Sequence, residues 1–263
     1  MTEFSIQILS AEGEVKACDK AEGYAGLYYE QEYQPGDKIV ITPSQAGCHA
    51  WIQVDEVVGA SQVYLTGPFT YIVPFGAQKS NLCAKAFTGN IHYLYVRQAN
   101  PEQVTQYRNL AVNVCDQHTA ENAYPHATAN VETRGEAVFF ASNAIDGIVE
   151  NRNHGAWPYL SWGINRNPDA EITVDFGREV DVDKVVIVIR ADFPHDSWWT
   201  QGTLRFSDGS ELVFPLEKDR FGQEIRFEKK RIRWIKLGEL IKADDPSPFP
   251  ALTQLEVYGV DAE

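Results

Sequence analysis

Two short segments frame the second half of the chain: Ser142-Asn143-Ala144-Ile145-Asp146-Gly147 and, beside the C-terminus, Gln254-Leu255-Glu256-Val257-Tyr258-Gly259. The first segment places a carboxylate in a tight Asp-Gly turn, and the second places one on a closing strand. In a β-sandwich the first and last strands lie close together, so a long separation in sequence is compatible with contact. We therefore expect Asp146 and Glu256 to lie near each other.

Four further segments accompany this pair in a fixed order: Arg108-Asn109-Leu110-Ala111-Val112-Asn113, Asp175-Phe176-Gly177, Arg190-Ala191-Asp192 and Arg231-Ile232-Arg233-Trp234-Ile235-Lys236-Leu237. Taken together, the ordered set resembles the discoidin domain, also called the coagulation-factor type C domain, and its relatives, the family 32 carbohydrate-binding modules. The resemblance covers roughly residues 108–260. It implies a galactose-binding-like jelly roll that binds carbohydrate.

Length and composition favour two globular β domains. The chain has 263 residues, above the usual size of one domain, and 44% of them are apolar. Thirteen Phe, twelve Tyr and six Trp bias the chain toward strands. The net charge of −14 would repel nucleic acid and anionic membrane surfaces. Its densest basic run, residues 229–233, alternates with an apolar residue, as on a solvated sheet face.

Turn signals divide the chain into short alternating segments. In residues 1–100, strands are expected at 4–9, 26–33, 38–42, 50–58, 62–65, 69–73 and 91–96. They predict an N-terminal β-sandwich of unknown role. Residues 97–107 read as a linker or short helix. Residues 108–263 are expected to form the discoidin-like jelly roll, with strands at 171–176, 182–190, 204–206, 211–214, 223–227, 231–237 and 253–260. Asp208-Gly209 predicts a tight hairpin turn.

The N-terminus predicts a cytoplasmic protein, because it carries neither a basic segment nor an apolar run typical of a signal peptide. If a leader has been trimmed away, secretion is expected instead. Four cysteines stand far apart, without zinc-ligand spacing: Cys18, Cys48, Cys83 and Cys115. We expect reduced thiols, several of them buried, or two disulfides in a secreted protein.

A structural calcium is the cofactor that the resemblance implies, held by Asp146 and Glu256. Calcium prefers six to eight oxygen ligands. After Asp146-Gly147 this chain departs from the family's usual loop, which leaves the third side-chain ligand open among Glu150, Asn151 and Asn153. The alternative is that Asp146 caps its own turn and Glu256 pairs with a surface arginine.

The resemblance implies that two loops form the ligand site, at one end of the second sandwich. They are residues 151–162 and 192–199, which mix aromatic rings with hydrogen-bonding side chains, as sugar recognition requires. The predicted ligand-binding residues are Asn153, His154, Trp157, Arg190, His195, Asp196, Trp198 and Trp199. One of the adjacent indoles is expected in the core, and Trp162 matches the family's buried tryptophan.

Three functions follow from these patterns. The first is a non-catalytic carbohydrate-binding protein that recognises a glycan or oligosaccharide through loop aromatic and polar residues. The second is a carbohydrate-active enzyme with a cleft between the two sandwiches, and the third is a protein-interaction module. No familiar catalytic motif is present, so the reading favours a protein without catalysis. The sequence leaves the sugar, any protein partner and the oligomeric state open.

Overall fold

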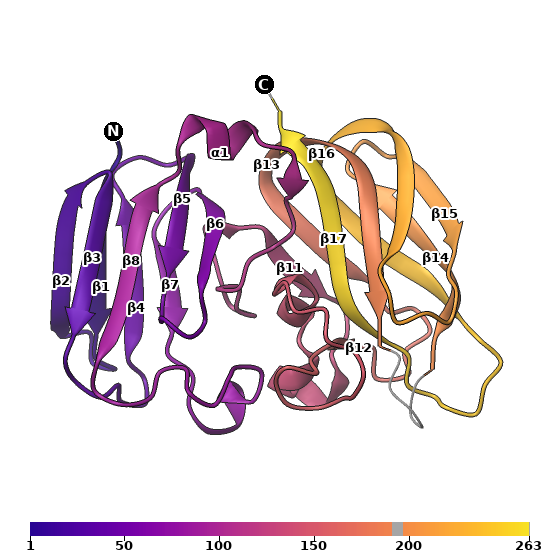
Figure 1. Ribbon diagram of the computed structural model, residues 1–263, viewed down its shortest axis with the longest axis horizontal. Coiled ribbons are helices and arrows are strands. Elements are labelled where there is room, and N and C mark those ends of the chain that lie inside the picture. Colours follow the sequence, from indigo (N-terminus) through magenta and orange to yellow (C-terminus); the bar gives the residue numbers. More distant parts are fainter. Residues whose placement is uncertain (191–196, 263) are drawn as a thin grey trace.

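The computed structural model describes residues 1–190 and 197–262. Helix makes up 8% and strand 48% of the chain, which confirms the expected all-β class. Two β units lie side by side, with the N- and C-termini at the same end of the molecule (Figure 1). The short helix α1 (Pro101–Thr105) crosses between the units at that end, within the expected linker.

The first unit is a sandwich of two antiparallel sheets. One sheet has the order β2-β1-β4-β7, and the other has the order β10-β6-β5-β8-β3. The strands are β1 (Glu3–Leu9), β2 (Val15–Glu22), β3 (Tyr24–Tyr29), β4 (Lys38–Pro43), β5 (Cys48–Gln53), β6 (Ala60–Leu65), β7 (Phe69–Ile72), β8 (His92–Gln98) and β10 (Ala123–Tyr124). In β1, alternation sends Phe4, Ile6 and Ile8 into the core.

The sequence analysis missed two strands of this unit, the two-residue β10 and the longer β2. β2 is an edge strand that pairs only with β1 within its sheet, and none of its residues is buried. Its sequence is correspondingly polar, Val-Lys-Ala-Cys-Asp-Lys-Ala-Glu. The hydrophobic alternation that predicts a half-buried strand is therefore missing from it.

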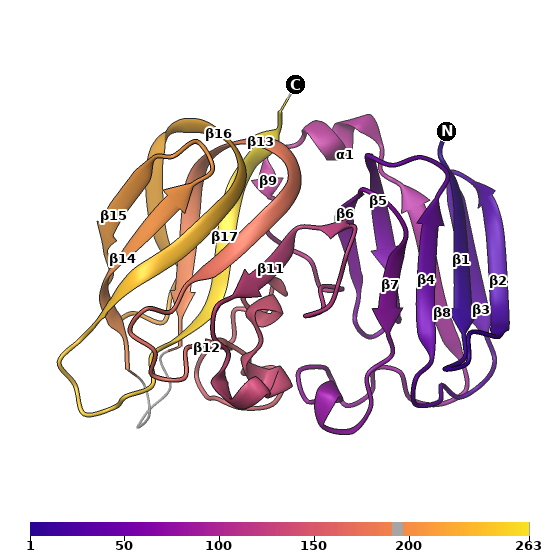
Figure 2. The same ribbon diagram turned by 180° about the vertical axis from the view of Figure 1, so that it is seen from behind.

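The second unit is one strongly bent eight-stranded sheet that encloses its own core. Its strands are β9 (Arg108–Asn109), β11 (His126–Ala129), β12 (Trp162–Gly163), β13 (Ile172–Ile189), β14 (Trp199–Phe206), β15 (Glu211–Pro215), β16 (Gln223–Lys242) and β17 (Ala251–Asp261). Seen from both sides, the long strands β13, β16 and β17 form the body of this unit (Figures 1 and 2).

Two pairs of predicted strands are in fact single long strands. The segments 171–176 and 182–190 join into β13, and 223–227 and 231–237 join into β16. The ladder between β13 and β16 shifts register between Asp175 and Val180, where Gly177 has φ +66°. A glycine accepts this conformation readily, so the strand bends there without ending. The hairpin of β14 and β15 around Gly209 is confirmed.

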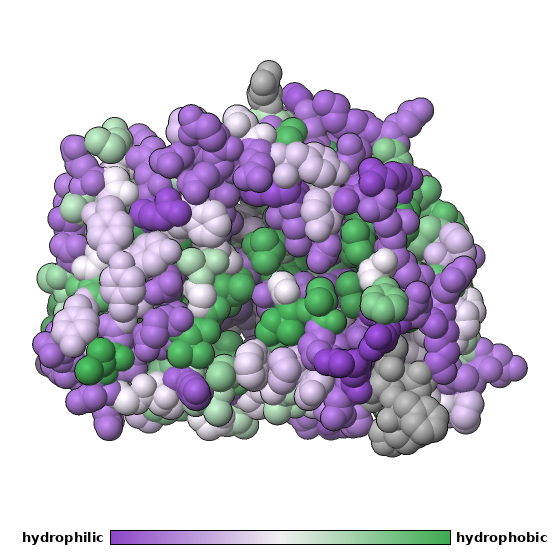
Figure 3. Space-filling view, viewed as in Figure 1, coloured by the Kyte–Doolittle hydropathy of each residue, from purple (hydrophilic) through white to green (hydrophobic). Residues whose placement is uncertain are grey.

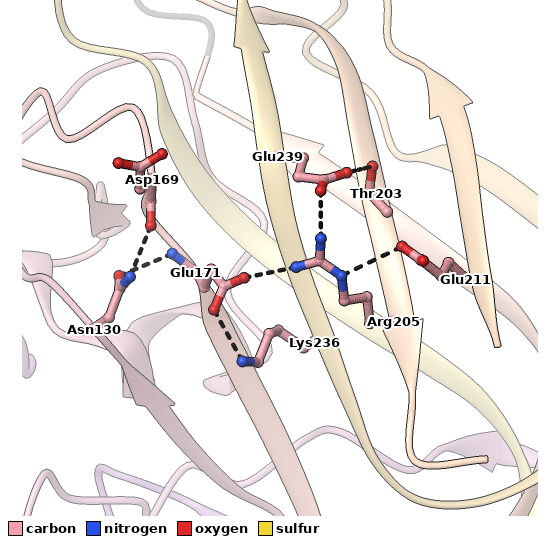
Figure 4. Close-up of polar contacts among 8 residues, drawn as sticks. All are labelled: Asn130, Asp169, Glu171, Thr203, Arg205, Glu211, Lys236 and Glu239. Atoms are coloured by element: carbon pink, nitrogen blue, oxygen red, sulfur yellow. Dashed lines mark hydrogen bonds and ion pairs between the residues drawn. The ribbon is translucent and has the colours of Figure 1, made fainter. Parts of the chain in front are cut away.

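A polar network covers one exposed face of the second unit (Figure 4). Arg205 on β14 lies at its centre and bonds Glu171 at 2.8 Å, Glu211 at 3.4 Å and also Glu239. Lys236 on β16 donates to the second oxygen of Glu171 at 2.9 Å. The basic run 229–233 is likewise mostly exposed, with Arg231 paired to Asp181. The exposure of the basic run agrees with the expected solvated sheet face.

Four 3-10 helices complete the chain: η1 (Gly76–Lys79), η2 (Thr133–Gly135), η3 (Ala137–Phe139) and η4 (Ala141–Ile145). The last three lie in the second unit at the end opposite the termini, next to β12 (Figure 1). Buried at the heart of the second core is Trp162, as expected, and its indole N–H donates to the Val131 carbonyl at 2.9 Å.

The two units meet over a broad junction. Cys115, Ala120 and Ala123, which follow β9, pack into the first core, and β10 pairs with β6. The proposed boundary between residues 100 and 108 stays a prediction. Apolar side chains gather in the middle of one face, where the halves meet, while hydrophilic residues surround them (Figure 3).

All four cysteines are free thiols, and two of them, Cys48 and Cys115, are buried. This agrees with the expectation of reduced cysteines. Within residues 1–190 and 197–262, helices are too short or too polar to cross a lipid bilayer.

Candidate ligand-binding site

A pocket of about 290 Å³ opens at the loop end of the second unit. Two predicted ligand residues, His154 and Arg190, border it. The other lining residues are Thr133, Arg134, Phe139, Gly163, Ile164, Asn165, Arg166, Phe249, Pro250 and Ala251. They come from η2, η3, the segment around β12 and the segment before β17. The pocket lies at the end of this unit where the resemblance places the ligand site, while most of its lining residues were not among the predicted ones.

Strained backbone positions hold two of the arginines. Arg134, Asn165 and Arg166 have φ angles of +54°, +48° and +60°, and they are three of the six non-glycine residues with positive φ in the described chain. Such angles cost energy for a residue with a Cβ and concentrate at functional sites. Gly163 permits the packing beneath them, because a Cβ there would lie 2.6 Å from Thr133 Oγ1.

The pocket is basic although the molecule is acidic. Arg134, Arg166 and Arg190 line it, and none of the described lining residues is an aspartate or glutamate. Arg134 is bonded to the exposed Glu136 by two hydrogen bonds of 2.6 and 2.8 Å. Arg166 makes no ion pair with any described residue, and its guanidinium lies 4.5 Å from the ring centre of Phe249. Among residues 1–190 and 197–262, the Arg166 charge therefore faces the pocket region without a neutralising carboxylate.

Arg190 is held from behind. Its side chain is buried, and its Nη2 donates to the Phe249 carbonyl at 3.2 Å. This bond ties the end of β13 to the segment that precedes β17. The guanidinium of Arg134 lies 5.6 Å from the ring centre of Phe139, so both phenyl rings of the pocket contact a guanidinium.

Other predicted ligand residues lie elsewhere. Asn153 is exposed and does not line the pocket. Trp157 is 43% exposed, and its backbone N–H donates to the Ser80 carbonyl of the first unit at 3.2 Å, so it lies toward the junction. His195 and Asp196 fall outside the described residues.

The two adjacent indoles behave differently from the prediction that both contribute to binding. Trp199 is 1% exposed and belongs to the core, so its assignment as a ligand residue was wrong. Trp199 and Leu204 of β14 both lie in the core although five positions separate them, because the ladder with β16 shifts register between Trp199 and Thr203. Trp198 is half-buried against the same core. The expectation that one of the pair is a core residue is confirmed by Trp199.

Arg134, Arg166 and Phe249 were missed by the sequence analysis. Signals for the last two existed in hindsight: Asn165-Arg166-Asn167-Pro168 is a turn-rich segment directly after a core tryptophan, and Phe249-Pro250 precedes the closing strand. Neither segment marks a site by itself. Their convergence depends on how three separate loops pack together.

The predicted calcium ligands contact other groups. Asp146 Oδ1 accepts the Ile148 backbone N–H at 2.7 Å and the Gln254 Nε2 amide at 2.6 Å. The same amide nitrogen donates to the Asn143 carbonyl at 2.7 Å, and Gln254 Oε1 accepts the Gly147 N–H at 3.1 Å. The Gln254 amide thus occupies the point on which two oxygens converge. A cation could bind there only by displacing it.

Glu256 faces a different environment. Its carboxylate accepts the Tyr258 hydroxyl at 2.9 Å and borders a second pocket, which Asp146 does not line. As arranged, these side chains do not fit a shared calcium site. Asp146 does cap its own turn, as in the alternative reading. Asp146 as a whole is partly exposed, but its Oδ2 atom is buried and has no hydrogen-bond partner. This burial raises the pKa of Asp146 to about 8.

A larger cleft of about 410 Å³ lies between the two units. Tyr71 and Leu82 line it from the first unit, and Phe140 and Asp146 line it from the second. Asp116 also borders the cleft, but both of its oxygens are engaged: Oδ1 with His126 Nδ1 at 2.7 Å and Oδ2 with the Ala127 N–H at 2.9 Å. Burial raises the pKa of Asp116, while His126 opposes the shift.

No family model and no curated protein sequence matches the chain. Solved structures do resemble it. A chitosan-binding module of a chitosanase/glucanase from Paenibacillus sp. IK-5 is 21% identical and has a TM-score of 0.41, over 58% of this chain and 99% of the module.

Two further structures show the same likeness. The family 32 carbohydrate-binding module of C. perfringens NanJ, in complex with galactose, is 20% identical over 50% of this chain and 91% of its own, with a TM-score of 0.39. The lectin domain of lectinolysin, complexed with Lewis b antigen, is 19% identical over 59% of this chain and 98% of its own, with a TM-score of 0.44.

Proposed function

We propose that this protein is a non-catalytic carbohydrate-binding protein, and that the pocket lined by His154, Arg166 and Arg190 is its site. The observation that carries the proposal is the convergence of three arginines, a histidine and two phenyl rings at the loop end. Guanidinium groups offer several N–H donors in a fixed plane, which suits the hydroxyl and carboxylate oxygens of a sugar.

The size of the pocket limits the ligand. A volume near 290 Å³ stands at the low end of ligand pockets, which span about 300–1,000 Å³. One or two sugar rings fit this description better than a long chain buried along its length. A shallow site of this kind implies modest affinity, because little surface leaves water.

The three arginines among the described lining residues favour an acidic sugar as the ligand. The molecule carries −14 overall, so a basic pocket is not a consequence of its average composition. A carboxylate or sulfate on the sugar would gain a charge-assisted bond with Arg166, which has no carboxylate partner among the described residues. Neutral sugars would bind through hydroxyl contacts alone.

Titration of the full chain with matched sugars tests the proposal. The panel contains galacturonic acid, galactose and Lewis b, of which the last two occur in the similar structures. We expect galacturonic acid to bind at least about tenfold more tightly than galactose, which corresponds to one charge-assisted hydrogen bond. Calorimetry at low and high salt should show the difference shrinking as salt rises.

Arg166→Gln is the variant that isolates the acidic preference, and Arg226→Gln is its control. Arg226 is an exposed arginine of β16 that pairs with Glu224, away from the pocket. Loss of the preference in the first variant alone supports the assignment. If no sugar binds at millimolar concentration, carbohydrate binding is wrong; if galactose binds as tightly as galacturonic acid, only the acidic preference is wrong.

A carbohydrate-active enzyme is the second candidate, because the cleft between the units holds two acidic residues with raised pKa values. Asp146 would be the proton donor, since its pKa of about 8 keeps it protonated at neutral pH. Hydrolysis of a panel of aryl glycosides that is abolished in Asp146→Asn would favour this function. Equal background rates in the native chain and the variant would exclude it for those substrates.

A further inference from the structure

Three potential metal ligands cluster in the first unit, whereas the proposed sugar pocket belongs to the second. Asp55 and Glu56 lie in the turn between β5 and β6, and His92 begins β8. One donor atom from each lies within 4.8 Å of the others. Asp55 and His92 are buried, whereas Glu56 is exposed, so the cluster is accessible from the side of Glu56.

The hydrogen bond of His92 determines which ring nitrogen faces the cluster. His92 Nε2 lies 3.0 Å from the Gly89 carbonyl oxygen, which can only accept. A neutral imidazole must therefore carry its proton on Nε2 and present a lone pair at Nδ1. That atom is buried, has no hydrogen-bond partner, and lies 3.8 Å from Asp55 Oδ2. Two acceptors that face each other in this way call for a positive charge between them.

Backbone groups hold both carboxylates in place. Asp55 Oδ1 accepts the Val57 N–H at 2.9 Å, and Oδ2 accepts the Phe87 N–H at 2.8 Å. Glu56 Oε2 accepts the Tyr93 N–H at 3.2 Å. Phe87 delivers its N–H from a buried position with φ +52°, an unusual angle for a bulky residue. Supporting bonds of this kind are typical of groups that ligate metals.

We propose that Asp55, Glu56 and His92 form a binding site for a divalent transition metal such as Zn²⁺. Ligand atoms about 2.0–2.1 Å from a tetrahedral zinc stand roughly 3.4 Å apart, so His92 Nδ1 and Asp55 Oδ2, now 3.8 Å apart, would draw together by about 0.4 Å on binding. The exposed Glu56 side chain can close the remaining distance. An imidazole ligand favours zinc-like ions over calcium, which prefers oxygen alone.

Binding would tie the turn after β5 to the start of β8. These segments belong to strands that already pair in one sheet, so the metal would stabilise the first unit without a change of fold. Three protein ligands leave one position of a tetrahedral ion for water.

Cobalt titration of the metal-stripped full chain tests the site. We expect one equivalent of Co²⁺ to give the visible absorption of a tetrahedral complex, to be displaced by Zn²⁺, and to be unaffected by Ca²⁺. Glu56→Gln should weaken Co²⁺ binding by about tenfold or more, because it removes a ligand at an exposed position without disturbing the core. Zinc should also raise the Tm of the native chain more than that of this variant.

Glu14→Gln serves as the matched control, since Glu14 is an exposed glutamate at the start of the β2 hairpin. It should bind Co²⁺ as the native chain does. His92→Gln provides a second ligand variant, and its folding is checked by circular dichroism. Absence of tetrahedral absorption in the native chain, or equal affinity in the native chain and Glu56→Gln, would overturn the proposal. In either case a proton shared by His92 and Asp55 would account for the geometry.

Discussion

Asp146 combines a buried, unbonded oxygen with a turn that it caps, and its protonation should therefore control stability. Its folded pKa of about 8 lies above the ordinary value of 3.8. The unfolded chain releases this proton near pH 4, while the folded chain keeps it to about pH 8. Stability from this group is thus full below pH 4 and is lost as pH rises from about 4 to about 8.

The variant Asp146→Asn should remove this loss, because an amide does not titrate and its oxygen can still accept the Gln254 amide. As pH rises from 4 to 8, we expect the free energy of unfolding of the variant to increase relative to that of the native chain, by at most about 5 kcal/mol. Urea denaturation at several pH values measures this. A variant less stable than the native chain at pH 8 would contradict the assignment.

The predicted calcium site can be tested by adding Ca²⁺ to the native chain and to Asp146→Asn. If Asp146 binds calcium despite the Gln254 amide, millimolar Ca²⁺ raises the Tm of the native chain and leaves the variant unchanged. From the contacts of Gln254 we expect no shift in either protein.

Trp199 and Trp157 should differ sharply in their contribution to stability. Trp199 is fully buried in the second core, so Trp199→Ala leaves a large cavity and should cost about 3–5 kcal/mol. Trp157 is 43% exposed, and Trp157→Ala should cost less than about 1 kcal/mol. Neither variant should abolish sugar binding, provided that it folds. Lost binding in a folded Trp157→Ala would restore the original prediction for this residue.

At the scale of elements, the close contact between β13 and β17 depends on a glycine. A Cβ on Gly259 would lie 2.1 Å from the Asp181 carbonyl oxygen, a backbone atom that cannot turn away. Gly259→Ala should therefore cost at least about 2 kcal/mol in the free energy of unfolding. Gly238→Ala, on β16, is the control, because its Cβ would meet the flexible Glu171 side chain at 3.0 Å. Equal losses would show that the strand spacing adjusts.

At the scale of the whole molecule, charged groups from both units meet around Asp261 near the C-terminus. His49 of the first unit lies 3.5 Å from Asp261, which also bonds Arg108 at 3.0 Å and Arg178. Burial and the Arg178 charge lower the pKa of His49 to about 4. The histidine therefore stays neutral in the junction at physiological pH.

This junction should weaken in acid. Between about pH 6.5 and 4 the unfolded chain protonates His49 while the folded chain does not, so stability present above pH 6.5 is lost as pH falls. The loss is at most about 3 kcal/mol. In His49→Gln we expect a smaller decrease over this range than in the native chain. Identical pH profiles for the two proteins would contradict the role of His49. The comparison is best made in chains that also carry Asp146→Asn, because titration of Asp146 changes stability in the opposite direction over the same pH range.

Much of the fold was predictable because its signals are local. Alternation identified β1, β5 and β8, and Asp208-Gly209 identified the hairpin, since each depends on neighbouring residues. Strand continuity was not predictable. Gly177 lies at a bend within β13, but a glycine in a sequence can equally mark the end of a strand, so the pattern could not decide between the two.

The sequence by itself determined the all-β class, and it predicted a two-part organisation and a ligand site at one end of the second part. Tertiary structure alone decided which side chains meet there. Three separate segments carry Arg134, Arg166 and Arg190. Their charges act together only because the packing of these loops brings the side chains to one pocket. It also decided that Gln254, two residues before Glu256, contacts Asp146. Patterns along a chain specify local backbone form, whereas electrostatics depends on distances in space.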